Sequence, residues 1–147
     1  MRQVNAAGIE LVKRWESLRL RAYLCSAGKP TIGWGHTGGV LMGMECSEAQ
    51  ASAWLRADLA HAGEAVSALI TVPLSDNQFA ALVSFTFNVG RRALATSTLR
   101  KKLNAGEYCA VPEQMLRWNK ETKGGKKVVS RGLHHRRQAE IVLWNTV

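Results

Sequence analysis

Cysteine is scarce in this sequence, and its three copies do not form a disulfide or metal framework. Cys25, Cys46 and Cys109 cannot all pair within one chain, because their number is odd. No two of them follow CxxC or another metal-ligand spacing, so we expect neither a metal site nor another cofactor. Unpaired cysteines are typical of a reducing compartment such as the cytoplasm.

Long apolar runs are missing as well. No stretch approaches the roughly 18 apolar residues that a membrane-crossing helix requires. The first residues, MRQVNAAGIELVKRWE, lack the apolar centre of a secretory signal peptide. We therefore expect a protein that stays in the cytoplasm until another component releases it, without stable insertion into a membrane.

Acidic residues are few compared with basic ones. The chain has 20 lysines and arginines against 11 aspartates and glutamates, which gives a net charge of +9. Such a charge indicates an anionic partner, which could be nucleic acid, a membrane surface or a cell-wall polymer. Residues 117–137 hold eight of the basic side chains and a single acid, Glu121. This run is either a solvated surface or a region attracted to an anionic polymer.

The 147 residues fit one domain. Asn5 can cap a first helix whose apolar residues recur every three positions and which ends near Glu16. Turn residues between short β-prone runs predict an antiparallel hairpin and a glycine-rich loop within 21–40. The SEAQ segment that begins at Ser47 predicts a capping box and a helix over 48–69, about 30 Å long.

The second half of the sequence is typical of helices. Ser75 begins another capping box, and Gly90 marks the end of the helix that follows. Further helices are expected at 97–104, 112–118 and 132–144, with Pro112 in the first turn of one of them. The predicted fold class is α+β, mainly α, with one small sheet near the N-terminus.

Three polar residues have a spacing that suggests chemistry. Glu16 ends the first helix, Cys25 is expected on the first strand of the hairpin, and Thr31 opens the second strand. A tight hairpin would place Cys25 and Thr31 side by side, facing the helix end. Glycosidic cleavage needs a carboxylic acid beside the leaving oxygen and a group across the sugar ring that supplies or activates the attacker. Glu16 by itself could equally be a solvated helix-end glutamate.

The sequence resembles the T-even phage lysozyme family, glycoside hydrolase family 24, over nearly its whole length. The most specific part of this resemblance is a glutamate, followed nine residues later by a second polar group and then by PTIGxGHTG. The matching segments are WESLRLRAYLCSAGKPTIGWGHTG (15–38), FTFNVG (85–90), TSTLRKKLN (96–104) and RGLHHRRQAEIVLW (131–144).

The resemblance implies a lysozyme-like fold of two lobes joined by the long helix, within a single domain over 1–147. The smaller lobe, with the β-hairpin, would span about 17–60. The helical lobe would span about 61–147 together with the N-terminal helix. The implied function is that of an endolysin, which hydrolyses the β-1,4 bond between N-acetylmuramic acid and N-acetylglucosamine in bacterial peptidoglycan and lyses the host cell.

The resemblance also implies roles for single residues. Glu16 matches the general acid, Cys25 stands where the family usually has an aspartate, and Thr31 matches the threonine that holds the attacking water. His36 and Asp58 match an ion pair that fixes the active-site loop. Four further residues match positions that contact the sugar chain: Thr37, Phe87, Asn88 and Thr98. Arg131 matches an arginine that lies near the catalytic glutamate.

Three departures from the family pattern affect the site: Cys25, Ser17 and Pro112, which stands on a face that the family uses for sugar contacts. At Cys25 a thiolate could be the base for a water held with Thr31, which gives inversion, or it could attack the anomeric carbon, which gives retention. Cys25 could also be a small buried apolar residue without a role in the chemistry. Ser17 replaces the glycine that usually follows the glutamate, which predicts a slightly different backbone there.

Three alternatives remain open at this point. A lytic transglycosylase would cleave the same bond with one acid, but the presence of Thr31 favours hydrolysis. A nucleic-acid-binding protein would explain the charge, yet no helix-turn-helix, zinc-finger or RNP signature is present, so no nucleic-acid partner is expected. An inactive wall-binding relative would not need to retain both Glu16 and Thr31. We expect a monomer whose partner is peptidoglycan and whose release depends on a pore such as a holin.

Overall fold

The computed structural model describes all 147 residues and begins with the predicted helix and hairpin. Helix α1 (Ala6–Glu16) starts where the Asn5 side chain accepts a hydrogen bond from the N–H of Gly8, at 3.0 Å. Strand β1 (Arg19–Leu24) pairs antiparallel with β2 (Pro30–Gly33). Cys25 lies one residue beyond β1, not on it, and its N–H donates to the carbonyl of Lys29 (3.0 Å) to close the turn.

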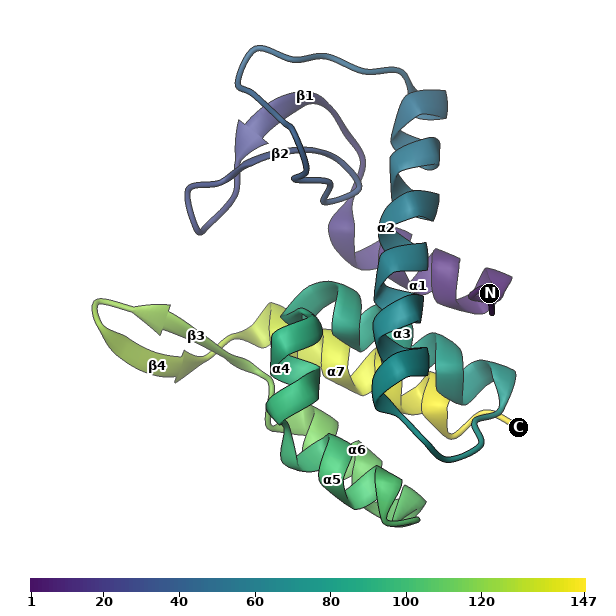
Figure 1. Cartoon of the computed structure of the whole chain (residues 1–147). Coiled ribbons are helices and arrows are strands. Elements are labelled where there is room, and N and C mark those ends of the chain that lie inside the picture. The colour runs from purple at the N-terminus through teal and green to yellow at the C-terminus, as the bar shows by residue number, and fades with distance from the viewer.

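Helix α2 (Glu48–Leu69) has the predicted bounds and links the two parts of the molecule (Figure 1). The Ser47 hydroxyl caps its first turn by accepting a hydrogen bond from the N–H of Gln50, at 3.1 Å. One end of α2 packs on β2, and the other packs on helices of the C-terminal half. A small apolar core lies under the hairpin and a larger one lies among the helices, so α2 contributes to the burial of both.

The helical part is built from five helices, four of which were predicted. They are α3 (Asp76–Val89), α4 (Arg91–Thr96), α5 (Thr98–Asn104), α6 (Val111–Leu116) and α7 (Arg131–Trp144). The capping box at Ser75 is complete, and Gly90 ends α3 with a φ of 96°. The prediction missed α4, because its six residues are too few to show a helical period.

A second sheet contradicts the prediction of a single hairpin near the N-terminus. Strand β3 (Lys120–Lys123) pairs antiparallel with β4 (Lys126–Val129) across a turn formed by Gly124 and Gly125, both with positive φ. Figure 1 shows this hairpin projecting from the helices as an arm, on the same side as β1 and β2. Its lysine-rich strands are largely exposed, so they lack the alternation of apolar and polar residues that marks a half-buried strand.

The predicted fold class, α+β and mainly α, is confirmed, as is the hairpin near the N-terminus. None of the helices combines the length and the apolar character that crossing a bilayer requires.

Candidate active site

One face of the N-terminal hairpin carries the predicted pair of residues. Tyr23 and Thr31 are partners in the β1–β2 register, so their side chains share a face of the sheet. Cys25 follows in the turn just beyond β1, and the Thr31 side chain is among the groups that lower the pKa of its thiol, so the two side chains lie close together. Burial, followed by the charges of Glu16 and Cys25, raises the pKa of Tyr23. The phenol therefore lies within range of the charges of both groups.

Glu16 is held at the end of α1 by an arginine from the far end of the sequence. Its Oε2 lies 2.5 Å from Nη1 of Arg136, and its side chain keeps 20% of its surface exposed. Gly35 approaches from the loop after β2: a Cβ at this position would lie 2.6 Å from Oε1 of Glu16. Ser17 takes up a φ of 52°, the left-handed region in which glycine carries little strain. These contacts fix the carboxyl group while leaving part of it open to solvent.

The arginine beside Glu16 is Arg136, and the prediction that it would be Arg131 is wrong. Arg131 is exposed at the first position of α7. Five residues along a helix add about 140° to a full turn, so the two arginines lie on different faces of α7. Only the face of Arg136 packs inward, and the motif could not show which arginine lies on that face.

Behind Glu16 lies a buried network of charged groups that sequence reasoning missed. Glu140 is completely buried, and its carboxylate lies 2.8 Å from Nε of Arg137 and 3.6 Å from Nε of Arg136. The Ser84 hydroxyl donates to the same carboxylate at 2.7 Å. Burial raises the pKa of Glu140, whereas the two guanidinium groups lower it. Glu140 thus neutralises one of two adjacent buried cations, and Glu16 accepts a hydrogen bond from the other.

The same network reaches a predicted sugar-contacting residue. Nη2 of Arg137 donates a hydrogen bond to Oδ1 of Asn88, at 2.8 Å. Arg137 also donates to the backbone carbonyl of Trp118, at 3.4 Å, at the base of the second hairpin. Asn88 is therefore connected to the Glu16 region through fixed side chains of α7.

Cys25 and Thr31 have the polar surroundings that chemistry would require. The backbone N–H groups of Lys29 and Ala27 hold the pKa of the Cys25 thiol below its usual range, which favours the thiolate. The Thr31 hydroxyl donates its one proton to the carbonyl of Lys29, at 2.9 Å. Its lone pairs are thus left to accept a hydrogen bond, although Thr31 as a whole is only 3% exposed.

A groove of about 390 Å³ lies between the loop after β2 and the helices α2, α3 and α4. Thr37 and Phe87, both predicted to contact the sugar chain, line it together with Gly35, which touches Glu16. Asn88 follows Phe87 and is partly exposed. Thr98 is exposed at the first position of α5 and is not among the residues that line the groove.

His36 and Asp58 connect this loop to the long helix. Nδ1 of His36 lies 2.7 Å from Oδ2 of Asp58 on α2, and the imidazole stacks on Trp54 of the same helix with 4.8 Å between ring centres. The loop that carries Gly35 and Thr37 is thereby attached to a rigid element. This arrangement agrees with a structural part for the pair, and neither residue contacts Glu16.

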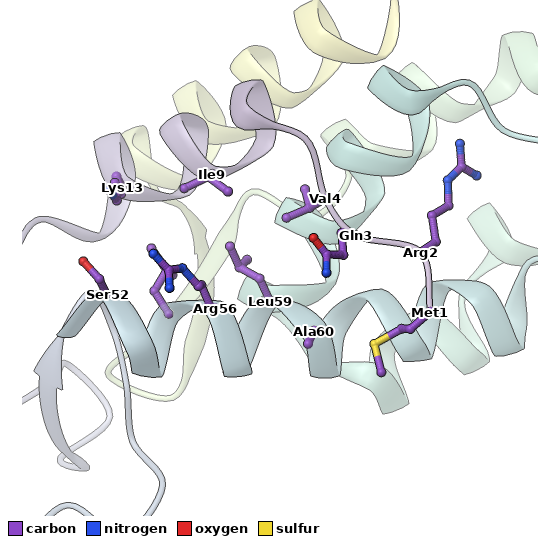
Figure 2. A pocket seen from close by; sticks show the side chains of 11 residues that line it. Met1, Arg2, Gln3, Val4, Ile9, Lys13, Ser52, Arg56, Leu59 and Ala60 are labelled. Atoms are coloured by element: carbon purple, nitrogen blue, oxygen red, sulfur yellow. The ribbon is translucent and has the colours of Figure 1, made fainter. Parts of the chain in front are cut away.

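A second hollow of similar volume lies away from these residues, between the N-terminal segment, α1 and α2 (Figure 2). Its floor is apolar, with Ile9 and Leu59 among the residues that form it, and Lys13 and Arg56 stand at its edge. No aspartate, glutamate, cysteine or histidine lines it. The groove lined by Gly35, which touches Glu16, is therefore the better candidate for catalysis, and Glu16, Cys25 and Thr31 lie outside its lining.

Comparison with known proteins agrees with this geometry. The family model described as phage lysozyme matches residues 13–140. An endolysin of Acyrthosiphon pisum secondary endosymbiont phage 1 is 42% identical over 143 residues, which cover 97% of this chain and 98% of the relative.

Two solved structures are similar over nearly the whole chain. The endolysin from Escherichia coli O157:H7 phage FAHEc1 has a TM-score of 0.90 and 42% identity, covering 98% of this chain and 94% of that one. The muramidase domain of SpmX from Asticaccaulis excentricus has a TM-score of 0.93 and 36% identity, covering 100% of both. The chain belongs to the phage lysozyme family and is a peptidoglycan-degrading enzyme of the endolysin type that serves host lysis.

Proposed function

We propose that this enzyme is a muramidase that hydrolyses the β-1,4 bond between N-acetylmuramic acid and N-acetylglucosamine, with Glu16 as general acid. The observation that supports this most directly is the carboxyl group of Glu16, which Arg136 holds beside the Gly35 backbone while part of its surface stays open to solvent. The named relatives include a muramidase domain, which favours the same bond.

The hairpin supplies the second half of the reaction in this proposal. A water molecule donates a hydrogen bond to the Thr31 hydroxyl oxygen and gives its other proton to the Cys25 thiolate. The oxygen of this water attacks the anomeric carbon. The glycosidic bond breaks, and the leaving oxygen takes the proton of Glu16. Cys25 then carries the proton that an aspartate carries in most of the family, and the product has inverted configuration at the anomeric carbon.

The mass of the products tests hydrolysis directly. Digestion of purified peptidoglycan should release muropeptides that contain one added water and a reducing N-acetylmuramic acid end. Anhydro sugars, which lack that water, would contradict the proposal and indicate a lytic transglycosylase. Reducing N-acetylglucosamine ends would show that the other glycosidic bond is cut.

We further propose that the arm formed by β3 and β4 attracts the enzyme to the anionic wall. Its four lysines face solvent with one acid, Glu121, among them, and Glu121 pairs with Lys123 at 3.7 Å. Peptidoglycan carries peptide carboxylates, and attraction between exposed charges weakens as the Debye length falls to about 3 Å near 1 M salt.

Salt and charge removal should therefore act on the same step. Lysis of chloroform-permeabilised Gram-negative cells should slow as salt rises, and replacing Lys120, Lys123, Lys126 and Lys127 with Gln should flatten that dependence. Cleavage of a short uncharged oligosaccharide is the control and should change little in either case. If the variant kept the salt dependence of the wild type, the β3–β4 arm would not be what attracts the enzyme to the wall.

The proposed enzyme acts as a monomer, without a cofactor, and crosses the inner membrane through a separate pore such as a holin. Expression without such a pore should then leave host cells intact, and spontaneous lysis would contradict this route.

A further inference from the structure

Glu16 has to carry a proton when it acts as general acid, and this sets a requirement on the buried charges behind it. Arg136 and Arg137 are both buried, and a guanidinium group stays protonated in proteins. A buried charge is costly unless an opposite charge compensates it. Glu16 can compensate Arg136 only while it is ionised, and in that form it has no proton for the leaving oxygen.

Glu140 is the other carboxylate beside these arginines. Its side chain has no exposed surface and lies 2.8 Å from Nε of Arg137 and 3.6 Å from Nε of Arg136. Its Oε2 accepts hydrogen bonds from the Ser84 hydroxyl on α3, at 2.7 Å, and from Nη2 of Arg137, at 3.2 Å. Nε and Nη2 of Arg136 have no hydrogen-bond partner within the protein. When Glu16 is protonated, the charge of Glu140 is therefore what compensates Arg136.

We infer that Glu140 is a positioning residue for the acid: its negative charge, acting through Arg136, lets Glu16 keep the proton that it gives to the leaving oxygen. The inference rests on the proposed function, in which Glu16 is the general acid. Glu140 is closed off from solvent, so it acts on the reaction only through its neighbours. With a neutral group in its place, two buried cations would favour the ionised form of Glu16, and the enzyme would lose its acid at a lower pH.

The other charged groups around Glu16 do not replace Glu140. Lys13 and Arg14, in the last turn of α1, are cations like the two arginines. On the hairpin, Tyr23 lies within range of the charge of Glu16, but a phenol is neutral at neutral pH. Cys25 is partly exposed, so solvent screens the charge of its thiolate. None of them supplies a buried negative charge.

The Glu140→Gln variant tests the inference, because Gln has nearly the same shape but no charge. At each pH, kcat/KM of the variant on a peptide-free glycan is divided by that of the wild type, so that the contributions of Cys25 and of the substrate cancel. We expect this ratio to be constant at low pH, where Glu16 is protonated in both proteins. It should then fall about tenfold as the pH rises, which corresponds to a displacement of about one pH unit in the ionisation of Glu16. A purely structural role would lower the ratio equally at every pH.

Two further variants separate charge from shape and from location. Glu140→Asp fits less well but keeps the charge, so its ratio should not depend on pH even if its rate is lower. Glu113→Gln removes the same charge from an exposed position on α6, and its ratio should stay near one throughout. The near-ultraviolet circular dichroism spectrum at each pH shows whether every variant is folded.

The Arg137→Gln variant changes the same balance in the opposite direction. It removes one buried cation and leaves Glu140, so Glu16 should keep its proton to a higher pH and the ratio to the wild type should rise with pH. The lost contact with Asn88 would alter KM alike at every pH. This variant carries the test if Glu140→Gln does not fold. The double variant Glu140→Gln/Arg137→Gln removes the two charges as a pair and should restore the wild-type profile.

The outcomes separate this inference from the proposed function. A Glu16→Gln protein with full activity would contradict the proposed function. Folded Glu140→Gln and Arg137→Gln proteins whose ratios do not depend on pH would overturn the inference and leave the proposed function in place. A ratio that falls with pH in Glu140→Asp would also overturn it, because that variant keeps the charge.

Discussion

Replacing Glu16 with Gln should lower kcat on peptidoglycan by about 10²–10⁴-fold, the usual contribution of a general acid. Gln has nearly the same shape, and its carbonyl oxygen can still accept the hydrogen bond from Arg136. The amide has no acidic proton to give to the leaving oxygen, so the loss should appear in kcat and not in substrate affinity. Turbidity of chloroform-permeabilised Gram-negative cells measures it.

Glu10→Gln is the matched control for this prediction. Glu10 lies on the same helix, is exposed, and makes no hydrogen bond or ion pair with another side chain. Its replacement removes the same charge from α1 and should leave lysis unchanged. If Glu16→Gln kept full activity with a native circular dichroism spectrum, Glu16 would not be the acid. Equal losses in both variants would point to net charge instead.

Local signals in the sequence were sufficient for most of the fold. Asn5, Ser47 and Ser75 each accept a hydrogen bond from the first turn of their helix, and such caps are visible in the sequence because they involve neighbouring residues. The turn that brings Cys25 near Thr31 was likewise predicted from its small and turn-forming residues. Helix α4, the 3-10 helix Tyr108–Ala110 and the second hairpin were missed. Two adjacent glycines, Gly124 and Gly125, are nevertheless a known signal for a two-residue turn.

The site could be predicted only in part, because some of its contacts join residues that are far apart in the sequence. Glu16 and Arg136 are 120 residues apart, and their contact depends on which face of α7 packs inward. That face is set by Glu140 and Ser84, whose pairing no local pattern reveals. Gly35 is similar: the sequence shows a flexible residue, but only the structure shows that a Cβ there would meet the Glu16 carboxyl.

Cys25 gives the second large prediction. If the thiolate accepts the proton of the attacking water, Cys25→Ala should lower kcat about 10²–10⁴-fold, because a general base is lost. Cys25→Asp should retain activity, since its carboxylate can take the same proton. Cys46→Ala and Cys109→Ala are the controls: neither thiol lies on the β1–β2 hairpin, and both variants should lyse cells as the wild type does.

The pH profile separates a base from a packing residue. The N–H groups of Lys29 and Ala27 lower the pKa of Cys25, and the thiolate forms as the pH rises through that lowered pKa. Both the wild type and Cys25→Asp use Glu16 as the acid, so the ratio of their activities depends on the base alone. Aspartate is already ionised above about pH 5, so this ratio should climb with pH as the thiolate forms. If Cys25→Ala reproduced the wild-type pH profile at full rate, the thiol would be a packing group without a part in the chemistry. If the product retained its anomeric configuration, Cys25 would be the nucleophile instead of the base.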